Sequence, residues 1–172
     1  MSQPTLNDLL KQTSRSFYLT LRVLPRAIRP QIGLAYLLAR TTDTIADTEL
    51  VPLEQRLEAL QRLRERIRGA GEAALNFSTL ARQQGLPAER MLLDQCGRRR
   101  CAGLRSLAEG DLKLVRKVLE TIISGQELDL RRFAGANADN LVALQNDAEL
   151  DDYTYRVAGC VGGVLDGDVS GA

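Results

Sequence analysis

Two aspartates lie four positions apart in YLLARTTDTIADTEL, residues 36–50, which is an apolar stretch of the chain. If this stretch is helical, Asp43 and Asp47 lie on one face, about one turn apart. Arg40 precedes Asp43 by three positions and lies near the same face. The spacing therefore places two carboxylates and a guanidinium together at the edge of an apolar surface.

Paired carboxylates of this kind are suitable ligands for a hard cation. Mg2+ takes one or two protein carboxylates and completes its coordination shell with water and substrate phosphate. Arg40 can bind a phosphate oxygen directly. The pattern predicts a metal-bound diphosphate beside an apolar trough, and hence a substrate with a charged head and a hydrocarbon tail. The alternative is that Asp43 and Asp47 only solvate the end of a helix.

A second pair with the same spacing, Asp147 and Asp151, lies in DAELDD. It follows a polar loop and begins a predicted helix. Acidic side chains are favourable at that end of a helix because the helix dipole is positive there. We therefore interpret this pair as helix-start acids and not as metal ligands.

The composition narrows the classes of function. The 172 residues are 44% apolar and 26% charged, which indicates one soluble globular domain. The net charge of +1 makes nucleic acid an unexpected partner, and the basic run at 98–100 is interpreted as a solvated surface. The absence of histidine and the spacing of the three cysteines argue against a His/Cys zinc site and a Ser-His-Asp triad.

The N-terminal region and the lengths of the apolar runs bear on location. The segment MSQPTLNDLLKQTSRSF lacks the apolar core of a secretory signal. No run approaches the ~20 apolar residues that span a bilayer. We therefore expect a cytoplasmic protein, with membrane contact only at its periphery.

The elements that must position the acidic pair are helical throughout. Apolar residues recur every three or four positions, and no alternating strand pattern competes with them. The predicted fold is all-α, in one domain. The predicted helices are 6–13, capped by Thr5; a buried central helix at 31–48; one that begins at Pro52 and continues to 67; 111–133; and one from 147. Residues 75–88 are predicted to be less regular, with a turn at Gly85 and Pro87.

Three separated elements resemble the squalene/phytoene synthase family of head-to-head prenyltransferases. They are SRSFYLTLRVLP at 14–25, AYLLARTTDTIADT at 35–48 and YTYRVAGCVG at 153–162. Their order and spacing agree with the family pattern. The resemblance extends from about residue 7 to residue 162 and covers only the first part of a full family domain.

The resemblance implies a partial isoprenoid-synthase helical bundle around a central cavity. It implies Mg2+ binding by Asp43 and Asp47, and proton removal by Tyr153. Tyr36 is expected in the cavity wall, and Gln126 in a segment that lines the cavity. The substrate-binding set implied by the resemblance is Ser14, Arg15, Ser16, Arg40, Tyr36 and Gln126. Ala158, Gly159 and Gly162 are expected to allow close helix packing.

The implied reaction joins two prenyl diphosphates head to head. The squalene branch is expected, in which two farnesyl diphosphates pass through presqualene diphosphate, with NADPH as a cofactor if squalene is the product. A phytoene synthase-type condensation of geranylgeranyl diphosphate is the alternative. The second alternative is a non-catalytic helical remnant that binds a prenyl diphosphate or a partner.

The last ten residues depart from the family pattern. Residues 1–162 are interpreted as the N-terminal part of the domain, and 163–172, GVLDGDVSGA, as an aberrant glycine-rich tail. A second aspartate-rich helix, expected after the tyrosine element, is not in this sequence. We therefore expect a truncated chain that lacks catalysis by itself and self-associates through uncovered apolar helix faces.

Overall fold

The computed structural model describes residues 5–70, 75–96 and 101–162. Within these ranges the regular structure is helical, and the only β feature is an isolated bridge between Asn137 and Asn140. This confirms the all-α prediction. The basic run at 98–100 and the tail at 163–172 lie outside the described residues. No helix in the described ranges is both long and apolar enough to cross a bilayer.

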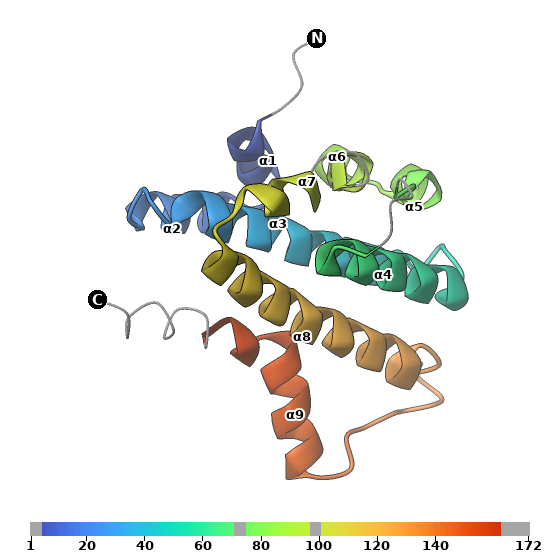
Figure 1. The fold of residues 1–172 in the computed structure, drawn as a ribbon. Helices are drawn as coiled ribbons and strands as arrows, with labels where there is room; N and C mark the ends of the chain where they lie inside the picture. Colours follow the sequence, from blue (N-terminus) through green and yellow to red (C-terminus); the bar gives the residue numbers. More distant parts are fainter. Residues whose placement is uncertain (1–4, 71–74, 97–100, 163–172) are drawn as a thin grey trace.

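Two long helices occupy the centre of the molecule. They are α3 (Arg29–Ala46) and α8 (Glu109–Phe133), which pack along each other. Figure 1 shows α4 beside this pair and α9 below α8, while α1 and α6 lie on the opposite side of α3. The remaining bounds are α1 Leu6–Thr13, α2 Arg15–Val23, α4 Leu53–Arg68, α5 Ser78–Gln83, α6 Pro87–Gln95, α7 Cys101–Gly103, η2 Leu104–Ser106, α9 Asp147–Val157 and η3 Gly159–Val161.

Local signals in the sequence set several helix ends. Thr5 and Asp8 form a reciprocal capping box at the start of α1, as the predicted cap requires. Gly69 ends α4 with φ of 89°, a conformation that side chains with a Cβ rarely adopt. Pro52 is the N-cap of α4, and so lies one residue outside the helix it was predicted to begin. The segment predicted to be irregular contains a short helix, α5.

Helix α3 is buried on more than one face, as predicted. Leu34 and Leu38 belong to the main core with α4 and α8, whereas Leu37 packs with α1, α2 and α6. Its buried threonines do not leave polar atoms unpaired, because Thr41 Oγ1 donates to the Leu37 carbonyl at 2.7 Å and Thr44 Oγ1 to that of Arg40 at 2.9 Å. The buried threonines of α3 therefore lie in the core with their hydroxyl groups hydrogen-bonded.

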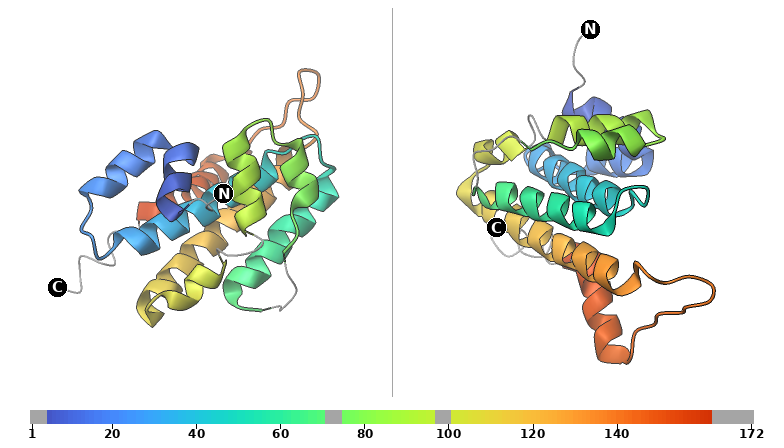
Figure 2. Two further views of the ribbon diagram at one scale, coloured as in Figure 1. Left: turned by 90° about the horizontal axis from the view of Figure 1, so that it is seen from above. Right: turned by 90° about the vertical axis from the view of Figure 1, so that its right-hand side faces the viewer.

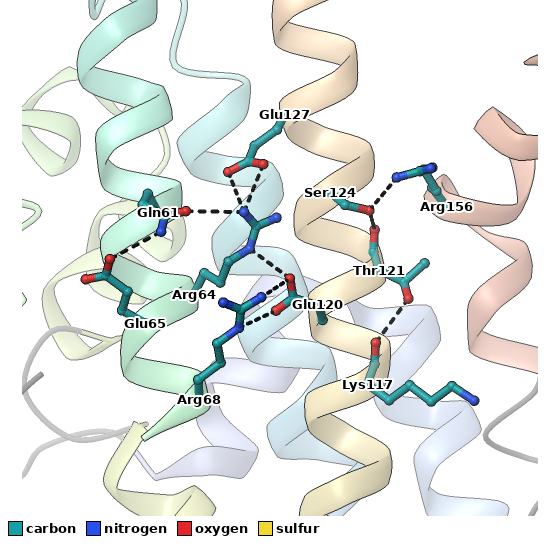
Figure 3. A network of polar contacts seen from close by, with 10 residues as sticks. All are labelled: Gln61, Arg64, Glu65, Arg68, Lys117, Glu120, Thr121, Ser124, Glu127 and Arg156. Carbon is teal, nitrogen blue, oxygen red and sulfur yellow. Dashed lines mark hydrogen bonds and ion pairs between the residues drawn. The ribbon is translucent and has the colours of Figure 1, made fainter. Parts of the chain in front are cut away.

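Ion pairs join α4 to α8 where the two helices pack side by side (Figure 3). Arg64 Nη1 lies 3.0 Å from Glu127 and Arg64 Nε 3.1 Å from Glu120. Arg68 Nη2 also approaches Glu120, at 2.6 Å. The two arginines and two glutamates balance in charge. The network fixes the register of α4 against α8.

Helix α9 approaches α8 closely at Gly125. A Cβ added there would lie 3.0 Å from Cβ of Arg156. The close approach was expected instead at the glycines after α9. At Gly162, however, no described atom lies within 4 Å of the added Cβ, so that residue supports no close packing here. Gly125 therefore has the role that was expected of Gly162.

Candidate active site between α3 and α8

Asp43 is held between the two central helices. Gln126 Nε2 of α8 donates a hydrogen bond to Asp43 Oδ1. Arg40 Nη1 lies 3.8 Å from Asp43 Oδ2, and its Nη2 lies 2.8 Å from Glu89 of α6. Three residues of the predicted set, namely Arg40, Asp43 and Gln126, are thus in direct contact. The Asp43 side chain remains 38% exposed and accessible to a ligand.

Negative charge exceeds positive charge around this pair of aspartates. Burial raises the pKa of the Asp43 carboxyl, and the charge of Asp47 adds to the rise, while Arg40 and Gln126 oppose it. Burial also raises the pKa of Asp47, which Arg40 opposes and the charges of Asp129 and Glu89 increase. The mutual effects place five carboxylates, those of Asp43, Asp47, Asp129, Glu89 and Glu49, near the guanidinium of Arg40. Such a cluster favours the approach of a cation.

Tyr153 of α9 joins the cluster through Asp129. Its hydroxyl donates to Asp129 Oδ1 at 2.9 Å, and its ring meets Phe133 edge-on, with centroids 6.1 Å apart. Burial raises the pKa of Tyr153, and the hydrogen bond to Asp129 and its charge raise it further. The phenol therefore stays protonated at neutral pH, beside a carboxylate that can accept its proton.

An apolar groove leads to the cluster. It has a volume of about 150 Å3 and lies between α2, α3, α8 and η3. Ala39 of α3 and Ile122 of α8 line it, each four residues before a polar member of the site, Asp43 and Gln126 respectively. Residues four apart share a helix face, so groove and cluster are continuous along both helices. The groove is the described counterpart of the predicted central cavity.

Aromatic side chains form one wall of the groove. The rings of Phe17 and Tyr36 stack with centroids 3.8 Å apart and 11° between their planes. Tyr36 lies about 10 Å before Asp43 along α3. This agrees with its predicted place in a cavity wall.

Ser14, Arg15 and Ser16 are not in contact with the acidic cluster. Ser14 is the N-cap of α2, accepts from Phe17 N at 3.3 Å and lies 3.3 Å from the Ser16 hydroxyl. Arg15 is exposed at the first position of the same helix. Phe17, one turn further on, reaches the groove, so these residues lie beside its α2 wall. Their role in binding stays a prediction.

The donor chemistry of the site fits Mg2+ with a phosphorylated ligand. In the described part of the chain, no group of three or more acidic, cysteine or histidine side chains could hold a metal ion. The acidic pair is therefore not a cage formed by protein alone. Mg2+ commonly uses one or two carboxylates and takes its other ligands from water and phosphate. The excess negative charge around Asp43 and Asp47 is consistent with such a site.

Sequence reasoning did not identify Glu89 as a member of the site. It pairs with Arg40 across 49 residues of chain, and no local pattern signals such a contact. Asp129 lies in the segment around Gln126 that was expected to line the cavity, and it connects Tyr153 to Asp47. Its position one turn after Gln126, on the same face of α8, is the signal that could have identified it. The pair Asp147 and Asp151 is exposed at the start of α9, as interpreted from the sequence.

The fold and the site together define a class: an all-α bundle with an acidic cluster at the end of an apolar groove. The chain belongs to the squalene/phytoene synthase family, whose pattern matches residues 10–165. This is a family of prenyltransferases that join prenyl diphosphates head to head. The match confirms the family predicted from the three sequence elements.

Individual relatives agree with this membership. The presqualene diphosphate synthase of Rhodopseudomonas palustris (strain ATCC BAA-98 / CGA009) is 35% identical over 147 residues, which cover 86% of this chain and 41% of that protein. The bifunctional lycopene cyclase/phytoene synthase of Blakeslea trispora is 33% identical over 61 residues, 36% of this chain and 10% of that protein. The chain thus spans less than half the length of these curated relatives.

The fold also matches solved structures. The complex of TcSQS with the ligand E5700 superposes with a TM-score of 0.70 at 24% identity, covering 93% of this chain and 42% of that one. The complex of TcSQS with BPH1237 gives a TM-score of 0.69 at 23% identity, with the same coverage. These two likenesses establish the all-α fold and no more.

Proposed function

We propose that the protein condenses two farnesyl diphosphates head to head to presqualene diphosphate, in a reaction that depends on Mg2+. The observation that carries the proposal is that Asp43, which lies 3.8 Å from Arg40, follows by one turn Ala39, a residue that lines the apolar groove. A prenyl diphosphate has the matching form, with a doubly phosphorylated head and a hydrocarbon tail. The 35% identity with a presqualene diphosphate synthase favours this branch over phytoene synthesis from geranylgeranyl diphosphate.

Asp43 and Asp47 would hold the metal, and Arg40 would contact the diphosphate. When bound, Mg2+ supplies Lewis-acid stabilisation of the departing pyrophosphate. Gln126 fixes one oxygen of Asp43 and leaves the other directed toward Arg40. Glu89 holds the far side of Arg40 and limits the directions in which the guanidinium can move. Ser14, Arg15 and Ser16 are proposed to bind the diphosphate of a substrate at the α2 side of the groove.

The groove protects the allylic cation that remains after pyrophosphate departs. Its walls at Ile32, Ala39 and Ile122 exclude the water that would quench the cation. The stacked rings of Phe17 and Tyr36 offer a face for cation–π stabilisation. Tyr153 would accept the proton lost in cyclopropane closure while its own hydroxyl proton passes to Asp129. NADPH would be required only if the product is reduced to squalene.

The test is product formation by the purified chain, and product would overturn the expectation from the sequence that this chain lacks catalysis by itself. Farnesyl diphosphate with Mg2+ is expected to give presqualene diphosphate, detected by mass spectrometry, and geranylgeranyl diphosphate is expected to react more slowly. Tyr153→Phe should lower turnover by about 100-fold or more, because general acid–base groups contribute about that much. Tyr155→Phe is the matched control, since Tyr155 is exposed on the same helix and should retain activity. No product from the folded wild-type protein would contradict the proposal.

One observation favours a second candidate, namely binding without turnover. Helix α9, which carries Tyr153, has no buried residue, and Leu150, Tyr155 and Val157 are exposed on it. The side of the site formed by α9 is therefore uncovered in the described chain. A protein of this kind would bind farnesyl diphosphate with Mg2+ but form no product, and it would self-associate through the exposed apolar face. Sedimentation at several concentrations tests the association separately.

A further inference from the structure

Helix α2 presents a face of alternating arginine and apolar side chains to solvent. We call this the α2 basic face and define it as Leu19, Arg22, Val23 and Arg26. The first three residues recur at helical spacing on one side of α2, and Arg26 follows the end of the helix. All are exposed, and Leu19 and Val23 remain 61% and 82% accessible.

The opposite face of α2 is committed to the core. Leu21 is buried in the cluster formed with α1, α3 and α6, and Phe17, Tyr18 and Leu24 pack against that cluster. The exposure of Leu19 and Val23 is therefore not the fraying of a loose helix. These two apolar side chains project from a helix that the protein holds in place.

Positive charge is concentrated in this part of the sequence. Between Leu9 and Thr42 there are six lysines and arginines and no acidic residue, although the whole chain has a net charge of only +1. A cleft of about 440 Å3 beside α2 is lined by Arg22, Arg26 and Arg29. Arg29 is bound to the Leu24 and Arg22 carbonyls, at 2.8 and 2.6 Å, so Arg22 and Arg26 supply the accessible cations of this cleft.

The α2 basic face lies at the edge of the molecule. Figure 2 shows α2 at one extremity, away from α4 and α5. On its inner side, Phe17 stacks on Tyr36 in the wall of the apolar groove. A flat surface that contacts the basic face would therefore meet the protein next to the α2 side of that groove.

We propose that the α2 basic face docks the protein onto the surface of an anionic lipid membrane. Arginines interleaved with protruding apolar side chains match a bilayer interface, where head groups carry negative charge and acyl chains accept leucine and valine. A nucleic acid would satisfy the arginines but would leave Leu19 and Val23 without an apolar partner. The proposed contact is peripheral, because it uses exposed side chains of a helix whose other face packs in the core. The proposal does not depend on the function proposed above.

The test is co-sedimentation of the purified chain with lipid vesicles. Binding is expected with phosphatidylcholine vesicles that contain phosphatidylglycerol, and not with phosphatidylcholine alone. Raising the salt from about 0.1 M to about 1 M should release the protein, since the screening length falls from about 10 Å to about 3 Å. Arg22→Glu/Arg26→Glu should lower the bound fraction by about tenfold or more, because each basic side chain at an anionic surface adds to binding.

Matched controls separate the face from net charge and general hydrophobicity. Arg105→Glu/Arg131→Glu makes the same charge change at exposed positions elsewhere and should retain most of the binding. Leu19→Ser/Val23→Ser should weaken binding, whereas Leu50→Ser/Leu141→Ser, at residues 76% and 88% exposed, should not. Circular dichroism verifies that each variant is folded.

Three results would overturn the proposal. The first is equal loss of binding in the two charge-reversal variants. The second is that the protein binds vesicles without anionic lipid, and that Arg22→Glu/Arg26→Glu does not change this binding. The third is tighter binding to a DNA duplex than to anionic vesicles, with the same dependence on Arg22 and Arg26. Prenyl diphosphate binding is measured separately in detergent-free buffer without vesicles, so failure of docking and failure of the proposed activity are distinguishable.

Discussion

Helix α8 carries charged side chains on two sides, and the two sides differ in charge balance. Toward α4, two arginines meet two glutamates in close pairs, and Arg64 is only 12% exposed (Figure 3). Toward α3, five carboxylates, those of Asp43, Asp47, Asp129, Glu89 and Glu49, gather at the site of one guanidinium, that of Arg40. At the α4–α8 interface, the positive and negative charges balance within the protein. The other has excess negative charge and raised pKa values.

This difference separates stabilisation from ligand binding. Balanced pairs leave no charge for a ligand and their removal should destabilise the fold. An unbalanced cluster of acids costs stability until a cation arrives, and perturbed carboxyl pKa values are typical of functional sites. The comparison therefore predicts opposite effects of neutralising a charge on the two sides of α8.

The largest effect on stability is expected at Arg64. Arg64→Ala leaves Glu127, itself 18% exposed, without its partner and should lower the free energy of unfolding by about 3 kcal/mol, since breaking a buried pair strands one charge. Urea denaturation measures the loss.

Arg62 provides the control for Arg64 on the same helix. It pairs with Glu58 at 2.5 Å, but both side chains are 59% exposed. Arg62→Ala should cost about 0.5 kcal/mol or less, as exposed pairs do. Equal losses from the two variants would contradict the structural role assigned to the α4–α8 network.

A smaller effect is expected where α9 docks on α8. Gly125→Val places a branched side chain against Cβ of Arg156 and should cost about 2 kcal/mol through overpacking. It should also separate Tyr153 from Asp129 and so weaken the acidic site. Gly110→Ala on the same helix has open space and should stabilise the protein by about 0.5–1 kcal/mol. Stabilisation by Gly125→Val would contradict the close approach of the two helices.

The smallest effect should have the opposite sign. Asp43→Asn removes a charge whose burial is unfavourable, so this variant should be more stable than wild type at neutral pH. The pKa of Asp43 in the folded protein lies above the ordinary value of 3.8. As the pH falls from above this raised pKa toward 3.8, protonation of Asp43 therefore stabilises the folded wild type. The advantage of the variant should therefore shrink in acid. Urea midpoints at neutral and acid pH measure it, and a constant difference would contradict the assignment.

Much of the fold could be predicted from the sequence because its signals are local. The capping box of Thr5 and Asp8 fixed the first helix, and the apolar spacing predicted α8 to within two residues of its start. The helices that were not predicted include α2, α5 and α6, whose six to nine residues carry too few turns for the apolar spacing to indicate a helix.

Residue spacing could predict the site only where its members are close along the chain. Arg40 and Asp43 lie on α3 and Asp47 is its C-cap residue, so their spacing alone brings them together. Gln126 meets Asp43 across 83 residues, and Glu89 meets Arg40 across 49, so only tertiary packing determines these contacts. The resemblance to the family predicted Gln126 as a site residue, whereas no feature of the sequence predicted Glu89.

Asp43 and Asp47 are proposed to form a cation-dependent diphosphate site. The most direct test is calorimetric titration of farnesyl diphosphate into the folded chain, with and without Mg2+. Binding is expected only with Mg2+, and Asp43→Asn/Asp47→Asn should weaken it by about 100-fold or more, because both metal carboxylates are gone. Binding should be retained in Asp147→Asn/Asp151→Asn, which has the same spacing and charge change on exposed α9. Equal affinities in the two double variants, or binding indifferent to Mg2+, would contradict this proposal.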